Sequence, residues 1–164
     1  PVDCVRLGLT TLAPDAEVVI SGINPGGNLG VDLYMSGTVA AAREAAFMGR
    51  RAIALSHYRS QDGELDWEAA SAHLRPLLED LLTRPHQPGT LWNVNLPHPL
   101  DRSIAPEVIE CRPDPAPLQI SYARESGGWI YAGDYHQRPR TPGHDVDVCF
   151  GGNVALSLIK VGGG

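Results

Sequence analysis

The hydrophobic pattern predicts alternating helices and buried strands over the first 97 residues. Apolar residues at helical spacing indicate three helices, over residues 2–12, 37–48 and 66–83. Short apolar runs indicate three buried strands, at residues 17–20, 51–56 and 91–96. Strands that alternate with helices favour right-handed crossovers on a parallel sheet, so we expect an α/β fold.

Proline residues mark two changes in this pattern. Pro76 lies inside the third helix, where it lacks an N–H and clashes with the preceding turn, so we expect a kink or two helices there. Beyond Pro97 the helical period disappears, and alternating residues predict strands at 104–111, 118–123, 129–132 and 146–150, with a hairpin turn at Ser126-Gly127-Gly128. We expect one domain over 1–164, with a core at about 1–97 and a β-rich extension at about 98–164 that has no core of its own.

Residues 21–30, SGINPGGNLG, should form a loop, and its second half, residues 26–30, is called the glycine loop below. Ligands of parallel sheets lie beyond the carboxyl ends of the strands, and the first N–H groups of a helix attract anions. We therefore expect phosphate or another anion to bind between the glycine loop and the start of the helix at 37–48, where Ser36 or Thr38 would add a hydroxyl donor. Ser36 would also be a good N-cap, and a glycine-rich turn before an ordinary serine cap explains the same residues without any ligand. The spacing matches neither a Walker A motif nor the dinucleotide fingerprint.

Composition and charge limit the kinds of partner that this chain can bind. The chain has 164 residues, 43% of them apolar, a formal charge of −6 and no block of like charges, which argues against a nucleic-acid polymer or an anionic membrane surface. No apolar run approaches the roughly 20 residues of a membrane span. The three cysteines are widely spaced and form no Cys-x-x-Cys, so we expect reduced thiols in a cytoplasmic protein.

Other polar residues leave alternatives open. Asn24 follows the first strand, and its carbonyl suits Mg²⁺, Mn²⁺ or Ca²⁺ as one ligand among carboxylates, although an Asn there equally satisfies a turn. His57 either faces the same cleft or is a satisfied loop residue. Asp145 and Asp147, on one side of a predicted strand, either bind a metal or are solvated. Arg138 and Arg140 either bind phosphate or lie in an exposed loop.

The central block of the chain resembles the SurE family of survival proteins, which are metal-dependent nucleotide phosphatases. The resemblance rests on SGIN, a loop ending in NLG, and then SGTVAAAREAAFMGRRAIALS. It is supported by PVDCVRLGL at the start, NVNLP at 93–97 and the ending DVDV…GGNVALSLI, so it covers essentially the whole chain.

This resemblance implies a Rossmann-like sheet with helices on both faces, a projecting antiparallel β-hairpin, and a homodimer or homotetramer. The family holds a divalent metal, Mg²⁺ or Mn²⁺ with Ca²⁺ as a third candidate, through two adjacent aspartates, a serine and an asparagine. Only the asparagine has a match here, Asn24, and the sequence contains no Asp-Asp pair. The residues that match the family's phosphate-binding side are Gly26, Gly27, Asn28, Ser36, Gly37 and Thr38. The chain therefore resembles a SurE protein without its N-terminal segment, and no catalytic residue is identified in it.

The implied function is a phosphomonoesterase that uses a divalent metal to hydrolyse nucleoside monophosphates or other small phosphomonoesters, acting as a 5′/3′-nucleotidase. The alternative is a non-catalytic SurE-like fragment that keeps only the oligomer surface and a weak anion-binding loop.

Overall fold

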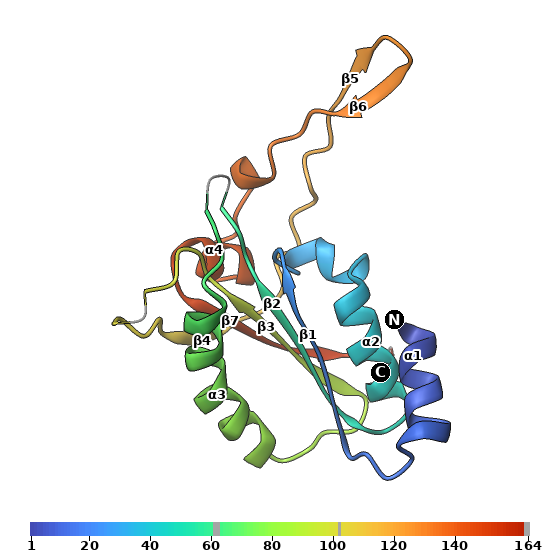
Figure 1. Ribbon diagram of the computed structural model, residues 1–164. Coiled ribbons are helices and arrows are strands. Elements are labelled where there is room, and N and C mark those ends of the chain that lie inside the picture. The colour runs from blue at the N-terminus through green and yellow to red at the C-terminus, as the bar shows by residue number, and fades with distance from the viewer. Residues whose placement is uncertain (61–62, 102, 163–164) are drawn as a thin grey trace.

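The computed structural model describes residues 1–60, 63–101 and 103–162, and a five-stranded mixed sheet lies at its centre (Figure 1). The strand order is β1-β2-β3-β7-β4. The strands span Val18–Pro25 (β1), Arg51–His57 (β2), Thr90–Leu96 (β3), Val154–Lys160 (β7) and Val108–Glu110 (β4). The first three are parallel, as predicted, whereas β7 runs antiparallel to β3 and parallel to β4.

Helices cover both faces of the sheet, which confirms the predicted fold class (Figure 1). Along β2, Ala52 and Ala54 face helix α2 (Gly37–Phe47), while Ile53 and Leu55 face helix α3 (Trp67–Thr83). The alanines of α2 let that helix approach the sheet closely. Helix α1 (Val2–Leu7), which continues as a π-helix over Gly8–Leu12, packs beside α2.

Helix α3 is one continuous helix of 17 residues, so of the two alternatives expected at Pro76, a kink or two helices, the second is wrong. Pro76 lies on the exposed side, and Leu74, Leu77 and Leu81 bury the opposite side in the core between α3 and the sheet. This burial holds the helix together across the missing hydrogen bond of Pro76. None of the helices in the described ranges is long and apolar enough to cross a membrane.

The second half of the chain differs from its prediction in the bounds of two strands and in one helix. The strand predicted at 104–111 shortens to β4 (Val108–Glu110), and the one predicted at 118–123 is shifted to β5 (Tyr122–Glu125). Residues 146–150 belong to a helix, α4 (Asp145–Phe150), and not to a strand. This helix packs with Leu29 and Tyr58, so the second half shares a core with the first.

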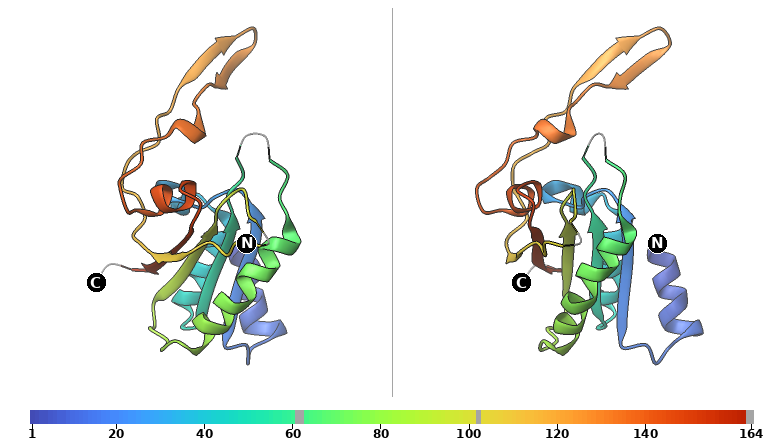
Figure 2. Two further views of the ribbon diagram at one scale, coloured as in Figure 1. Left: turned by 90° about the vertical axis from the view of Figure 1, so that its left-hand side faces the viewer. Right: turned by 60° about the vertical axis from the view of Figure 1, so that its left-hand side comes forward.

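The predicted hairpin is confirmed. Strand β5 pairs antiparallel with β6 (Gly128–Tyr131), and Gly127 takes a positive φ of 111° in the turn between them. The hairpin, residues 122–131 and called the arm below, projects away from the sheet in all three views (Figures 1 and 2).

Candidate active site

The glycine loop starts where β1 ends, at the carboxyl edge of the parallel strands. Residues 21–25 lie within β1, so the prediction that they form a loop is wrong. Gly26 donates its N–H to the carbonyl of His57 at 2.8 Å, which ties the loop to the end of β2. The φ of Gly26 is +118°, a value that favours glycine over any residue with a Cβ. The loop is therefore fixed at the edge where parallel sheets bind ligands.

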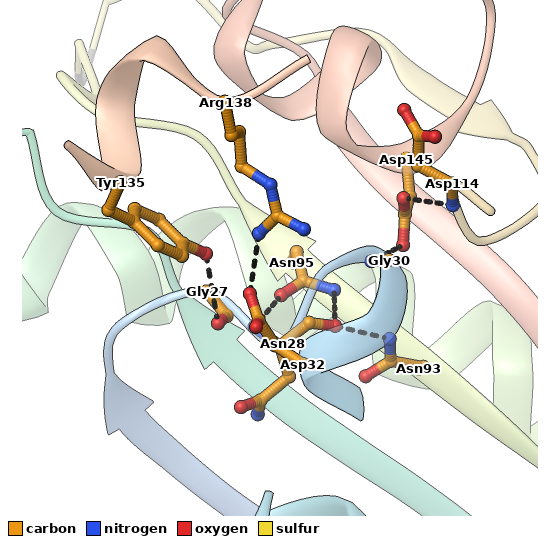
Figure 3. Close-up of polar contacts among 10 residues, drawn as sticks. All are labelled: Gly27, Asn28, Gly30, Asp32, Asn93, Asn95, Asp114, Tyr135, Arg138 and Asp145. Carbon is orange, nitrogen blue, oxygen red and sulfur yellow. Dashed lines mark hydrogen bonds and ion pairs between the residues drawn. The ribbon is translucent and has the colours of Figure 1, made fainter. Parts of the chain in front are cut away.

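Side chains of the neighbouring strands hold Asn28 of the glycine loop, and Figure 3 shows its bonds to Asn93 and Asn95. Asn28 is buried, its N–H donates to Asn95 Oδ1 at 2.7 Å, and its carbonyl accepts from Asn93 Nδ2 at 2.9 Å. Asn93 and Asn95 lie two apart on β3 and so face the same side. The Asn28 amide also donates to Ser56 Oγ on β2. Sequence reasoning missed these supports, although two asparagines at alternate positions of a buried strand were a signal.

Asn24, the predicted metal ligand, belongs to the same network. Its Oδ1 accepts from Asn28 Nδ2 and from Ser56 Oγ, both at 3.1 Å, and its Nδ2 donates to the carbonyl of Gly26 at 3.0 Å. Asn24 therefore joins the end of β1 to the loop that follows it, as an Asn at a strand end commonly does.

The N-terminus of α2 carries the other predicted phosphate residues. Ser36 is the N-cap, as predicted, because its Oγ accepts from the N–H of Val39 at 3.1 Å. The N–H groups of Gly37 and Thr38 donate to no other described residue. These two donors, together with the hydroxyl proton of Ser36, are available to an anion at the positive end of the helix dipole.

A buried carboxylate fixes the far end of the glycine loop. Asp145, at the start of α4, is fully buried and accepts from the N–H of Gly30 and of Asp114, each at 2.8 Å (Figure 3). Burial raises its pKa, although the backbone donors act in the opposite direction. The predictions of a strand and of a solvated or metal-binding aspartate here are therefore wrong.

A second contact joins the glycine loop to the segment that follows the arm. Arg138 is buried and pairs with Asp32, and its guanidinium lies 5.1 Å from the ring centroid of Tyr135. The Tyr135 hydroxyl in turn donates to the carbonyl of Gly27 at 3.5 Å (Figure 3). The prediction of an exposed Arg138 is wrong, because its charge is neutralised by Asp32 in the interior.

The family model described as "Survival protein SurE" matches residues 1–112, more than half of the chain. The chain belongs to the SurE family. A putative 5′-nucleotidase of Nostoc is 49% identical over 161 residues, which are 98% of this chain and 71% of that protein. A 5′/3′-nucleotidase SurE of Photorhabdus laumondii is 39% identical over 98% of this chain and 64% of its own length.

The fold agrees with this membership. The crystal structure of a SurE protein from Aquifex aeolicus superposes with a TM-score of 0.80 at 25% identity, and it covers 98% of this chain and 66% of that one. The SurE-like sheet, its flanking helices and the separate hairpin are thus common features.

A divalent metal does not fit the described residues as a complete SurE metal site. Within those residues, no three or more His, Cys, Asp or Glu side chains gather where they could hold an ion. The side chains bonded to Asn24 are the neutral Asn28 and Ser56, and one neutral oxygen without carboxylates holds Mg²⁺ or Mn²⁺ poorly. Asp147, the other aspartate of α4, accepts a hydrogen bond from the N–H of Gly143 at 2.9 Å.

His57 lies inside the SurE fold and not on the cleft. It is fully buried, and one ring nitrogen, Nε2, lies 3.1 Å from the carbonyl of Pro97. Burial lowers its pKa, so the ring stays neutral at pH 7. Of the two alternatives for His57, the structure supports the one without a ligand.

Proposed function

We propose that this chain carries the phosphate-binding part of a nucleotidase, a phosphomonoesterase that acts on nucleoside monophosphates. The observation that carries the proposal is the 49% identity to a protein named as a putative 5′-nucleotidase, over 98% of this chain. The aligned region takes in almost the whole chain, and therefore also the glycine loop and the start of α2.

The phosphate is proposed to bind at free donors only. The N–H groups of Gly26 and Asn28 already donate within the protein, so these two residues shape the loop. Gly27 N–H, which donates to no described residue, and the α2 donors at Ser36, Gly37 and Thr38 remain for phosphate oxygens. Hydrogen bonds to a charged ligand are stronger than those between neutral groups. A few such bonds can therefore hold a small anion even though the protein itself carries a net negative charge.

A divalent metal enters the proposal through Asn24 alone, as one neutral ligand. A tight site needs carboxylates that the described residues do not bring to Asn24. We expect Mn²⁺ to bind this chain at about millimolar strength or weaker. In calorimetry, Asn24→Asp should tighten binding, because it adds a carboxylate, and Asn24→Ala should abolish it. Equal Mn²⁺ affinity in all three proteins would remove Asn24 from the metal site.

The lack of carboxylates around Asn24 among the described residues favours a second candidate, a non-catalytic SurE-like chain with a weak anion site. In either case we propose self-association into a homodimer or homotetramer, since the arm exposes large apolar side chains. A cytoplasmic location stays a prediction, in keeping with the three free cysteines, Cys4, Cys111 and Cys149.

Ser36 offers the sharpest test of the phosphate site. Glycine is a tolerable N-cap, so Ser36→Gly removes the hydroxyl while lowering the free energy of unfolding by only a few tenths of a kcal/mol. We expect its affinity for inorganic phosphate and for a nucleoside monophosphate to fall about 10-fold in calorimetry. Ser36→Thr keeps both hydroxyl and cap and should retain the affinity.

Phosphate release on the same samples separates the two candidates. Release of inorganic phosphate from a nucleoside monophosphate with Mg²⁺ or Mn²⁺ supports the enzyme. Binding without hydrolysis supports the non-catalytic alternative. If Ser36→Gly binds phosphate as tightly as the unaltered chain does, Ser36 is only a cap.

A further inference from the structure

A hollow of about 430 Å³ opens beside the glycine loop. Its walls come from three places in the chain: the residues that follow β1, the residues that follow β2, and the 3₁₀ turn Tyr135–Gln137. Its lining includes Gly27, Tyr58, Arg59, Tyr135 and His136. Its size is within the range of small-molecule sites, and it borders the unpaired N–H of Gly27.

Two rings of the 3₁₀ turn form one wall of this hollow. The imidazole of His136 stands edge-on to the ring of Tyr135, with centroids 5.7 Å apart and an interplanar angle of 87°. Contact with the guanidinium of Arg138 keeps the Tyr135 ring in place. Both rings are only partly buried, so part of each remains accessible. A flat, apolar ligand can therefore stack here with little loss of side-chain freedom.

Tyr58 fixes the orientation of His136. The Tyr58 hydroxyl lies 2.7 Å from His136 Nδ1, and the Tyr58 ring is stacked on Phe150 at 4.3 Å. Burial raises the pKa of Tyr58, which therefore keeps its proton and can donate to Nδ1. In that arrangement Nε2 carries the proton of the neutral imidazole. His136 then offers an N–H donor to a ligand that bears ring nitrogens or carbonyl oxygens.

We propose that this hollow binds the base of a nucleoside monophosphate, with Tyr135 and His136 as the residues that select a nucleotide over a base-free sugar phosphate. The proposal rests on the proposed function, because it places the phosphate at the adjacent N–H of Gly27. The exposed Arg59 also lines the hollow and adds a cation to it. A ligand that spans from Gly27 into the hollow must have an anionic end and an aromatic end, and a nucleotide has both.

Binding of four ligands to the full chain tests the base site separately from the phosphate site. The ligands are adenosine 5′-monophosphate, ribose 5-phosphate, adenosine and inorganic phosphate, measured by calorimetry. Stacking and one hydrogen bond should make the nucleotide bind about 10-fold more tightly than ribose 5-phosphate. Tyr135→Leu should remove this preference, whereas Tyr135→Phe, which keeps the ring, should retain it. Thermal melts of both variants check that each is folded.

The four affinities test the base site and the phosphate site separately. Equal affinity of the unaltered chain for adenosine 5′-monophosphate and ribose 5-phosphate overturns the base site and leaves the phosphate site intact. Binding of adenosine without any binding of ribose 5-phosphate or inorganic phosphate supports the base site and overturns the phosphate site. Absence of binding by all four ligands overturns both. A nucleotide preference that survives Tyr135→Leu overturns the assignment to this hollow.

Discussion

At the scale of single residues, Asp145 is the contact that fixes the glycine loop to the second half of the chain. Its two oxygens accept from Gly30 and Asp114, residues that lie 115 and 31 positions away along the sequence. A carboxylate with two backbone donors can replace the hydration that it loses on burial. The loop therefore depends on a side chain that contacts no ligand itself.

Replacing Asp145 by Asn should destabilise the protein. An amide has one acceptor oxygen, so one of the two backbone N–H groups would face an NH₂ group and lose its partner. We expect the free energy of unfolding to fall by about 1–3 kcal/mol in urea melts. Asp147→Asn is the matched control on the same helix, and it should cost less because Asp147 is only partly buried. An equal loss in both variants would mean that burial of Asp145 is unimportant.

The stability difference between the unaltered protein and Asp145→Asn should also depend on pH. Burial raises the pKa of Asp145, so the folded protein binds this proton more readily than the unfolded chain does. The contribution of Asp145 to stability is therefore complete below its ordinary pKa of about 3.9 and is lost as pH rises through the raised value. Asparagine does not titrate. The difference in unfolding free energy between the unaltered protein and Asp145→Asn should shrink through this window, and a constant difference would contradict the assignment.

The site residues that could be predicted from the sequence are those whose hydrogen-bond partners lie close to them along the chain. Ser36 was recognisable as a cap, because its partner, the N–H of Val39, lies three residues further along the same helix. Asn93, Asn95 and Asp145 bond to residues that only the tertiary fold brings near. No spacing rule reaches across 65 or more positions, such as those between Asn28 and Asn93.

At the scale of elements, the central strands and helices followed from periodicity, and the failures have physical reasons. Helices α2 and α3 have long periodic patterns, and strand β2 is a continuous apolar run. In each of them the packing in the fold and the intrinsic propensity favour the same structure. Helix α4 was mistaken for a strand because Val146 and Val148 alternate with polar residues over a segment of only six residues. Its true pattern, with Val146 and Cys149 three apart and both buried, becomes clear only once the neighbours are known.

Pro76 gives a prediction at this scale. The residue is exposed in the middle of α3, so replacing it by Ala restores an N–H without disturbing the core. Helix propensity favours Ala by about 3 kcal/mol, and the restriction that Pro imposes on the unfolded chain returns up to about 1 kcal/mol. We expect Pro76→Ala to raise the free energy of unfolding by about 2 kcal/mol in denaturant melts. Arg75→Ala, its exposed neighbour, should change it by less than about 0.5 kcal/mol.

At the scale of the whole molecule, the arm is the feature that the sheet does not explain. Its cross-strand pairs place Tyr122 opposite Tyr131 and Arg124 opposite Trp129, so three aromatic rings share one face of the hairpin. All three rings are exposed, Trp129 by 69%. A two-stranded hairpin is marginally stable alone, and an exposed apolar patch of this kind marks an association surface. The edge strand β1, with Ile20 at 44% exposure, is a second candidate surface.

We predict that the chain self-associates and that the aromatic face of the arm is the contact. Trp129→Lys places a charge in the centre of that face and should lower the mass measured by sedimentation equilibrium to that of a monomer. Ile130→Lys puts the same charge on the opposite face of the same hairpin, so it should leave the assembly intact and control for loss of the hairpin itself. Ile20→Lys alters the β1 edge and should also leave it intact. If Ile20→Lys alone dissociates the assembly, the contact is the sheet edge, and a monomeric unaltered chain at micromolar concentration would rule out both surfaces.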